Sequence, residues 1–448
     1  MDTITAIATA AGAAGIAVIR VSGPAAEDVL RQCFRPVRPV KRLRSHQMYY
    51  GHVVRAGEVV DEAMAVLMRA PNSYTREDVA ELQCHGGRVA AERVLRCVLA
   101  AGARPAEPGE FTKRAFLNGR IDLSRAEAVM QMIGAGGEAA AKASARQLEG
   151  GVSTFVAGLE KRLTDAMAAI EASTDFPDEV EEETAAQEVE AEMRAIAAEL
   201  RARADGRGAR ILRVGASIVL AGPPNAGKSS LMNALLRWER AIVTEIPGTT
   251  RDVLTERVVF GGVAAELSDT AGLREAGDAV EKIGVARAQA AVEKADLVLL
   301  VLDGSRAPDI EALSLLNKGD ARLLLCLNKA DLGLCPEARA LSENVDIPVF
   351  ALSALDGRGV EALADALAER LQGLAGDADA LTVERHLGLA RRAAEDLERG
   401  AGGIRAGYPL DAAAVDLREA LSALGEITGR DATEAVIDSV FANFCVGK

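Results

Sequence analysis

Eight consecutive residues near the middle of the chain match the pattern of a phosphate-binding loop. The run Gly222-Pro223-Pro224-Asn225-Ala226-Gly227-Lys228-Ser229 fits G-x-x-x-x-G-K-[ST] and leads into a helical pattern at Ser230–Leu236. Glycine lets the backbone curl so that N–H groups point at phosphate, and the helix N-terminus adds positive potential. Lys228 would neutralise the terminal phosphates and Ser229 would bind Mg²⁺. The loop therefore predicts a nucleotide triphosphate site that uses magnesium.

Two further motifs belong to the phosphate end of such a site. Asp269-Thr270-Ala271-Gly272 follows a strand-like run, so that Asp269 would hold Mg²⁺ through water and the Gly272 N–H would contact the γ-phosphate. Gly248-Thr249-Thr250 lies in a loop from which Thr250 can reach the same ion. Both motifs follow the order expected of a nucleotide-hydrolysing domain.

Two motifs near the end of the same region predict that the base is guanine. Asn328-Lys329-Ala330-Asp331 ends a strand, and a carboxylate there accepts hydrogen bonds from guanine N1–H and the 2-amino group. Adenine offers no such pair of donors, and an unpaired Asp331 would disfavour it strongly. Ser353-Ala354 supplies a backbone N–H for the guanine carbonyl oxygen. The nucleotide is predicted to be GTP rather than ATP.

The residue after Gly272 is Leu273, where many GTPases carry a glutamine that orients the attacking water. An apolar side chain cannot do this, so another device is required. Asn225 and backbone carbonyls near Thr244–Thr249 could hold a monovalent cation where an arginine finger would otherwise act. Glu281 could orient the water through a second water, although a carboxylate at the start of an ordinary helix would look the same.

These motifs require a sheet with helices around it. Residues 213–375 alternate strand-like and helical runs, which is typical of an α/β domain. Gly261-Gly262 joins Val253–Phe260 to Val263–Ser268 and predicts a hairpin, hence one antiparallel pair in an otherwise parallel sheet. The four motifs in this order resemble the Ras-like small-GTPase fold.

The whole chain predicts an α/β plus α architecture with four segments. Residues 1–118 mix strand and helix patterns and predict an N-terminal α+β domain. Residues 119–212 and 376–448 are helical, and their apolar faces need partners. We therefore expect one helical domain formed from two chain segments, with the P-loop GTPase domain, 213–375, inserted between them.

Composition limits the function classes. Acidic residues outnumber basic ones by 66 to 52, and only nine Phe, four Tyr and one Trp are present, which argues against indiscriminate nucleic-acid binding and base stacking. No apolar run is long enough for a bilayer span, and the six scattered cysteines suggest a reducing, cytoplasmic compartment. Six basic residues and no acid lie between Arg31 and Arg44; they could form a solvated loop or a patch facing RNA or another anion.

Motifs at both ends of the chain resemble one family. Pro108-Gly109-Glu110-Phe111-Thr112, Arg114–Gly119 and Glu81-Leu82-Gln83 are similar to the N-terminal domain of the MnmE (TrmE) tRNA-modification GTPases, within the TrmE-Era-EngA class. The terminal Phe444-Cys445-Val446-Gly447-Lys448 is similar to that family's F-C-[IV]-G-K tail. The resemblance covers essentially the whole chain.

The resemblance implies an activity and partners that composition does not show. The family adds an aminomethyl-type group at carbon 5 of the wobble uridine of certain tRNAs, using a 5-formyl-tetrahydrofolate-type one-carbon carrier. It works with a flavin-dependent partner, MnmG (GidA), so FAD enters only through that partner. Its N-terminal domains form a homodimer, and its GTPase domains pair across the dimer when potassium is bound.

The resemblance also assigns residues. The expected folate contacts are Arg20, Glu81, Arg120 and Lys448, with arginine at position 120 where the family commonly has lysine. The expected potassium ligands are Asn225, Thr244, Ile246 and Thr249, and the Mg²⁺ ligands are Ser229, Thr250 and, through water, Asp269. The expected catalytic residues are Lys228, Thr250 and Glu281. The expected GTP contacts are Asn225, Ala226, Gly227, Lys228, Ser229, Ser230, Thr244, Glu245, Ile246, Pro247, Gly248, Thr249, Thr250, Asp269, Thr270, Ala271, Gly272, Asn328, Lys329, Ala330, Asp331, Ser353 and Ala354. Further candidates are Cys445, Arg251, Asp252 and Arg274.

Two other functions share parts of this pattern. A ribosome-assembly switch of the Era or EngA type has the same central motifs, but it would carry a basic RNA-binding domain with a G-x-x-G loop, whereas the C-terminal segment here is helical and acidic. A folate-binding regulator with a vestigial GTPase is disfavoured because Lys228, Ser229 and Asp331 are all present.

Overall fold

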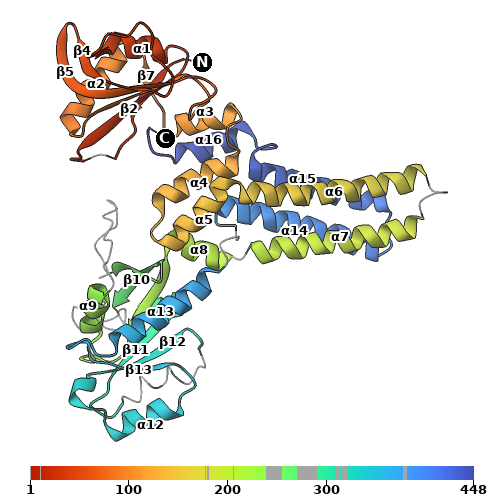
Figure 1. Cartoon of the computed structure of the whole chain (residues 1–448). Helices are drawn as coiled ribbons and strands as arrows, with labels where there is room; N and C mark the ends of the chain where they lie inside the picture. Colours follow the sequence, from red (N-terminus) through yellow and green to blue (C-terminus); the bar gives the residue numbers. More distant parts are fainter. Residues whose placement is uncertain are drawn as a thin grey trace, which may run out of the picture. The chain divides into compact units, whose positions relative to one another are not determined.

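The computed structural model describes residues 2–10, 12–176, 178, 181–204, 206–238, 255–269, 290–308, 313, 316, 320–376 and 381–447 (Figure 1). The chain divides into two compact units. The first comprises Met1–Met130, Gln147–Ile196 and Glu395–Lys448, and the second comprises Gln131–Arg146 and Ala197–Ala394. Within the part of the chain described, no helix combines the length and apolar character needed to span a bilayer.

The first unit contains a seven-stranded sheet in the order β3-β4-β5-β6-β2-β1-β7. Neighbouring strands are antiparallel, except that β1 and β7 are parallel. The strands are β1 (Ile4–Ile7), β2 (Ile16–Ser22), β3 (Phe34–Pro36), β4 (Met48–Arg55), β5 (Glu58–Met68), β6 (Val79–His85) and β7 (Arg104–Pro105). Helices α1 (Ala26–Cys33) and α2 (Arg88–Ala100) share one apolar core with this sheet.

The alternation of side chains along β2 separates that core from a second face. Ile19 and Val21 are buried in the core with α1 and α2. Arg20, between them in sequence, therefore lies on the opposite face of the sheet. Phe111 of α3 (Glu110–Leu117) belongs to a separate apolar cluster with Ile4 of β1.

The helices of the first unit are built on apolar stripes. An apolar stripe runs along α6 (Gly151–Asp175), where Leu159 and Leu163 are buried, and α6 packs along α15 (Leu410–Thr428). The last helix is α16 (Glu434–Ala442). Four helices have residues in both units: α4 (Leu123–Gly134), α5 (Glu138–Glu149), α7 (Glu182–Arg203) and α14 (Glu384–Arg405).

The second unit contains a six-stranded sheet in the order β13-β12-β11-β8-β10-β9. Its strands are β8 (Ala216–Ala221), β9 (Thr255–Phe260), β10 (Val263–Asp269), β11 (Leu297–Asp303), β12 (Leu323–Asn328) and β13 (Val349–Ala351). All described pairs are parallel except β9 with β10, so the predicted single antiparallel pair is confirmed. Gly261 and Gly262 both have positive φ, 55° and 83°, which the tight turn between these strands requires.

Apolar clusters cover both faces of this sheet, as is typical of parallel strands. Its helices are α8 (Gly206–Val214), α9 (Lys228–Trp238), α12 (Pro336–Asn344) and α13 (Val360–Ala375), with a short 3₁₀ turn, η3 (Ala330–Leu332). The predicted motifs at 222–229 and 328–331 follow the carboxyl ends of the parallel strands β8 and β12. Ligand sites in such sheets lie at this edge.

Candidate functional site

The loop between β8 and α9 has the backbone that its glycines predict. Gly222 has a φ of +140°, and a Cβ atom there would lie 2.1 Å from the carbonyl oxygen of Val301. Gly227 has a φ of +90°, and a Cβ atom there would lie 2.2 Å from the Asn328 side-chain nitrogen. Larger residues at either position would push this loop away from its neighbours. The loop is therefore fitted closely to the ends of β11 and β12.

Two side chains that the sequence assigns to phosphate and magnesium lie in this loop region. The Lys228 ammonium group is buried and donates hydrogen bonds to the carbonyls of Gly222 and Pro223, at 3.0 and 2.8 Å. Ser229 Oγ donates to Asp269 Oδ2 at 2.6 Å. A hydroxyl and a carboxylate this close, beside a phosphate-binding loop, are a fitting oxygen donor set for Mg²⁺.

The base-recognition motif is bonded directly to the phosphate loop. Asn328 Nδ2 donates to the carbonyl of Ala226 at 2.9 Å, and the Ala354 N–H donates to Asn328 Oδ1 at 3.0 Å. Asn328 thus connects three of the predicted motifs. The Ser353 N–H donates to the Arg358 carbonyl, so the backbone N–H groups of Ser353 and Ala354, one of which is predicted to meet the guanine carbonyl, both have acceptors within the protein. Asp331 lies on the exposed turn η3.

Lys329 has a left-handed backbone, with a φ of 64°, and its ammonium group bonds Asp303 Oδ2 at 2.7 Å. Burial disfavours the charged form of Asp303, but hydrogen bonds from Lys329 and Ser305 outweigh it and hold the pKa of this carboxyl below its usual value. No motif indicates Asp303 as a partner of Lys329, because Asp303 ends a different strand, β11.

The remaining predicted residues lie outside the part of the chain that the structure describes. They are Thr244, Glu245, Ile246, Pro247, Gly248, Thr249, Thr250, Arg251, Asp252, Thr270, Ala271, Gly272, Leu273, Arg274, Glu281 and Lys448.

A second cluster of predicted residues lies in the first unit. Arg20 of β2 and Glu81 of β6 are direct cross-strand partners, and Arg20 Nε bonds Glu81 Oε1 at 2.8 Å. The Arg20 guanidinium lies 5.4 Å from the ring centroid of Tyr74, and that of Arg120 lies 4.7 Å from the same ring. Sequence reasoning missed Tyr74, because nothing in the residues around it distinguishes it from other loop aromatics.

The C-terminal tail reaches this cluster. The carbonyl of Gly447 accepts a hydrogen bond from Arg20 Nη1 at 3.4 Å. The Gly109 N–H donates to the Cys445 carbonyl, and a Cβ atom on Gly109 would lie 2.8 Å from Cβ of Phe444. The two end motifs that carry the family resemblance are therefore in contact. Cys445 is an exposed free thiol.

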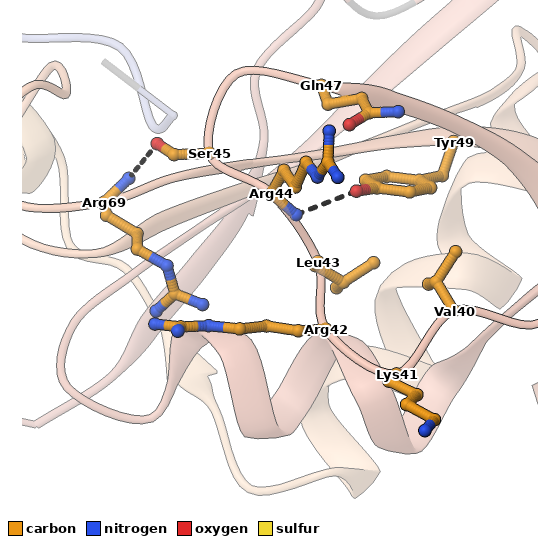
Figure 2. A pocket seen from close by; sticks show the side chains of 9 residues that line it. All are labelled: Val40, Lys41, Arg42, Leu43, Arg44, Ser45, Gln47, Tyr49 and Arg69. Carbon is orange, nitrogen blue, oxygen red and sulfur yellow. Dashed lines mark hydrogen bonds between the residues drawn. The ribbon is translucent and has the colours of Figure 1, made fainter.

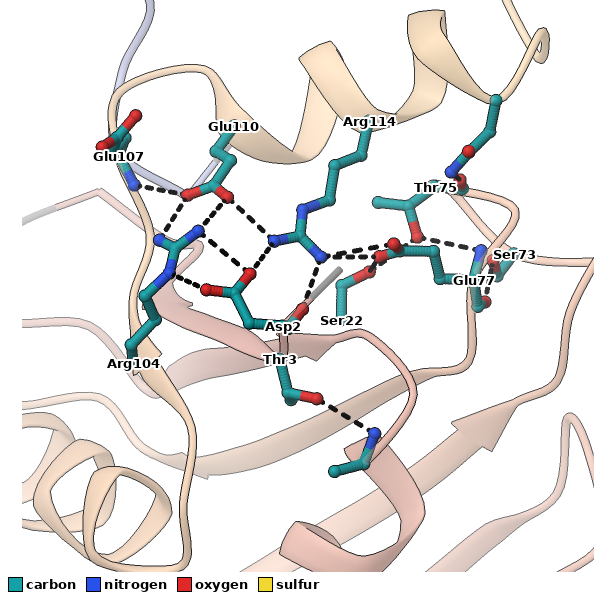
Figure 3. Close-up of polar contacts among 12 residues, drawn as sticks. Asp2, Thr3, Ser22, Ser73, Thr75, Glu77, Arg104, Glu107, Glu110 and Arg114 are labelled. Carbon is teal, nitrogen blue, oxygen red and sulfur yellow. Dashed lines mark hydrogen bonds and ion pairs between the residues drawn. The ribbon is translucent and has the colours of Figure 1, made fainter.

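A network of ion pairs holds α3 beside the cluster (Figure 3). The Arg114 guanidinium bonds Glu110 at 2.9 Å and Glu77 at 3.1 Å, and Arg104 bonds Glu110 at 2.6 Å. Asp2 bonds both arginines. Phe111, whose ring centroid lies 5.8 Å from the Arg20 guanidinium, is fixed by the helix that this network holds.

Comparison with known proteins gives similarity over the full length. The sequence profile of the "MnmE helical domain" matches residues 123–445, and that of the "GTP-binding protein TrmE N-terminus" matches residues 3–120. The chain is 47% identical over 455 residues to the tRNA modification GTPase MnmE of Chloroflexus aurantiacus, with 100% of both chains covered. It is 47% identical over 457 residues to that of Symbiobacterium thermophilum, with 100% of this chain and 99% of the relative covered. Among solved structures, the G domain of the T. maritima FeoB iron transporter is 29% identical, covers 36% of this chain and 99% of its own, and has a TM-score of 0.25.

Proposed function

The chain belongs to the MnmE family of tRNA modification GTPases, and from this membership we propose that it hydrolyses GTP to drive modification of the wobble uridine of tRNA at carbon 5. The observation that carries the proposal is the arrangement of Arg20, Glu81 and Arg120. These residues, expected to bind folate, lie together in a chain that also has every GTP motif.

The GTPase part of the proposal rests on the loop after β8. Bound Mg²⁺ would supply charge neutralisation between the phosphates. Ser229 and Asp269 would hold it, with Thr250 as a further ligand, while Lys228 would leave its loop carbonyls to meet the phosphates. Asp331 would select guanine, and Glu281 would orient the attacking water. No step here depends on Leu273, whose side chain has no polar atom.

Potassium would occupy the place of an arginine finger. Its ligands would be Asn225, Thr244, Ile246 and Thr249, the middle two partly through backbone carbonyls. Asn225 has a φ of 63°, a left-handed conformation that places this residue on the bend of the loop. We expect faster GTP turnover in KCl than in NaCl at equal ionic strength, and equal rates would contradict a potassium role.

The cluster around Tyr74 fits a reduced folate. A guanidinium suits the glutamate tail, a carboxylate suits pterin N–H donors, and an aromatic ring offers apolar contact. Arg20, Glu81 and Arg120 would therefore bind a tetrahydrofolate one-carbon carrier, with Lys448 from the tail. Bound folate would supply the carbon unit, and the chain's own residues would position it.

The proposal extends to architecture and partners. A helical domain made of residues 119–212 and 376–448, with the GTPase domain 213–375 inserted, is supported by the long match to the helical-domain profile. The first compact unit likewise draws on separate segments of the chain. We further propose a homodimer formed through the N-terminal domains, 1–118, a complex with the flavin-dependent MnmG (GidA), and a cytoplasmic location.

The decisive test is mass spectrometry of wobble nucleosides in tRNA from a strain that lacks this chain. We expect loss of the carbon-5 modification, restored by the wild-type chain and by Lys161→Ala but not by Lys228→Ala. Normal modification without the chain would reject the proposal. Normal modification together with defective ribosomal subunits would favour a ribosome-assembly switch of the Era type instead.

The guanine assignment has its own test. Asp331→Asn should shift nucleotide preference from GTP toward xanthosine triphosphate, because the amide pairs with a base that carries a carbonyl at carbon 2. Asp346→Asn, at an exposed carboxylate of the same unit, is the matched control. Unchanged GTP affinity in Asp331→Asn would contradict the assignment.

A further inference from the structure

The basic segment between Arg31 and Arg44 borders a pocket outside both candidate sites. The pocket has a volume of about 840 Å³, and four cationic side chains line it: Lys41, Arg42, Arg44 and Arg69. Figure 2 shows the guanidinium groups of Arg42 and Arg69 pointing toward one another. Like charges repel, and an anion bound between them would offset this repulsion. The arrangement therefore indicates a place for a negatively charged ligand.

The surrounding protein neutralises the charge of this pocket only in part. Lys41, Arg42 and Arg44 are exposed and form no ion pair with any residue in the described ranges. Arg69 is bonded to Glu27 at 2.6 Å and lies 3.9 Å from Asp78. Glu27 is shared with a second arginine, Arg31, at 2.9 Å, so one carboxylate serves two cations. In a chain with a net charge of −14, this local excess is an exception.

The segment is also held in a fixed conformation, unlike a freely solvated loop. The Arg44 N–H donates to the Tyr49 hydroxyl at 2.8 Å, and the Arg69 N–H donates to Ser45 Oγ at 3.0 Å. Leu43 and Tyr49 are buried, with exposures of 4% and 8%. The backbone therefore presents its cations at set positions, which lowers the entropy lost when a ligand binds.

We propose that this pocket binds phosphate groups of the tRNA backbone; the inference rests on the proposed function and adds the surface that holds its RNA substrate. Guanidinium forks match phosphate oxygens in pairs, and three of the four cations are arginines. Because the chain is acidic overall, its phosphate contacts must be concentrated in such a patch.

The test uses the full-length chain and a fluorescein-labelled, unmodified tRNA transcript, with affinity measured from 50 to 200 mM NaCl. The variant is Lys41→Ala/Arg42→Ala/Arg44→Ala. We expect at least about tenfold weaker binding at 50 mM salt and a decrease of about two to three in the slope of log affinity against log salt, since each phosphate contact contributes about 0.7–0.9. The matched control, Arg55→Ala/Arg93→Ala/Lys161→Ala, removes the same charge from exposed positions of the same unit that likewise have no ion pair within the described residues, and it should change affinity less than about threefold.

Three results would overturn the inference: unchanged affinity and slope in the pocket variant, equal losses in both triple variants, or no tRNA binding by the wild-type chain. Competition with poly-glutamate tests whether the pocket instead binds an acidic protein. A pocket variant that keeps tRNA binding but loses poly-glutamate binding would assign the pocket to an acidic protein.

The same variants are introduced into the strain used for wobble-nucleoside analysis. If the wild-type chain restores modification while the pocket variant binds tRNA normally, only this inference fails; if modification never depended on the chain, the proposed function fails.

Discussion

Two groups of arginines in the first unit have opposite surroundings. Arg104 and Arg114 are each bonded to two or more carboxylates, and the Arg114 side chain is only 6% exposed (Figure 3). Arg42 and Arg44 in the basic pocket are exposed and have no ion-pair partner among the residues described (Figure 2). The same residue type thus serves two purposes within one unit.

The difference shows which charges build the fold and which are available to a ligand. Burying a guanidinium costs several kcal/mol, and good geometry with several carboxylates repays that cost. The paired guanidinium groups hold α3 in place and, with it, Phe111 beside Arg20. An exposed, unpaired guanidinium has little such cost and contributes little to folding. Such a guanidinium can instead form its ion pair with a bound anionic ligand.

The largest effect is expected for Arg114→Ala. This change leaves Glu77 without an arginine partner and leaves Glu110 and Asp2 bonded only to Arg104, and we expect a loss of about 3–5 kcal/mol of stability. Hydrogen exchange of residues 110–117 should rise strongly, and urea unfolding should shift to lower concentration. Lys113→Ala, also on α3, removes a more exposed ion pair with Asp438 of α16 and should cost less than about 1 kcal/mol. Wild-type exchange rates in Arg114→Ala would show that the network does not support the fold.

Acid should weaken the ion-pair network that contains Asp2 and Glu110. The hydrogen bond from Arg104 lowers the pKa of Asp2 to about 2, although burial opposes it. Burial disfavours the charged form of Glu110, but Arg104 outweighs it and the pKa of Glu110 falls below 4.5. Because both pKa values are lower in the folded state, their stabilisation is complete above the ordinary values of 3.8 and 4.5 and is lost as the pH falls toward about 2.

This acid dependence can be measured by thermal unfolding between pH 6 and pH 2.5. The melting temperature of the first unit should fall by about 2–4 °C for each kcal/mol lost. A melting temperature that stayed constant down to pH 2.5 would contradict the assignment of the network as a source of stability.

Much of the nucleotide site could be predicted because its residues are consecutive. The loop from Gly222 to Ser229 and the motif at Asn328 are fixed by local backbone geometry, and their strands follow from apolar runs. The bond between Asn328 and Ala226 was not predicted, since it joins residues 102 positions apart. The motif indicates which side chains act, and the sheet determines which of them touch.

The site in the first unit shows more clearly where prediction from the sequence ends. Family resemblance named Arg20 and Glu81, but their contact depends on the register between β2 and β6. Tyr74 gave no signal, because its role depends on the path of a loop. The charges of the network looked like ordinary surface charges, since Asp2 and Arg114 are far apart in sequence.

The smallest effect is expected for the stability of Lys41→Ala/Arg42→Ala/Arg44→Ala. None of the three side chains has an ion pair to lose within the described residues, and the buried anchors Leu43 and Tyr49 are unchanged. Surface substitutions of this kind stay within about 0.5 kcal/mol each, and removal of like charges lowers their mutual repulsion. Urea unfolding should therefore overlay that of the wild type, while tRNA affinity falls. A loss of about 2 kcal/mol or more would mean that these cations stabilise the fold as Arg114 does, and the distinction between paired and unpaired arginines would then no longer separate structural charge from binding charge.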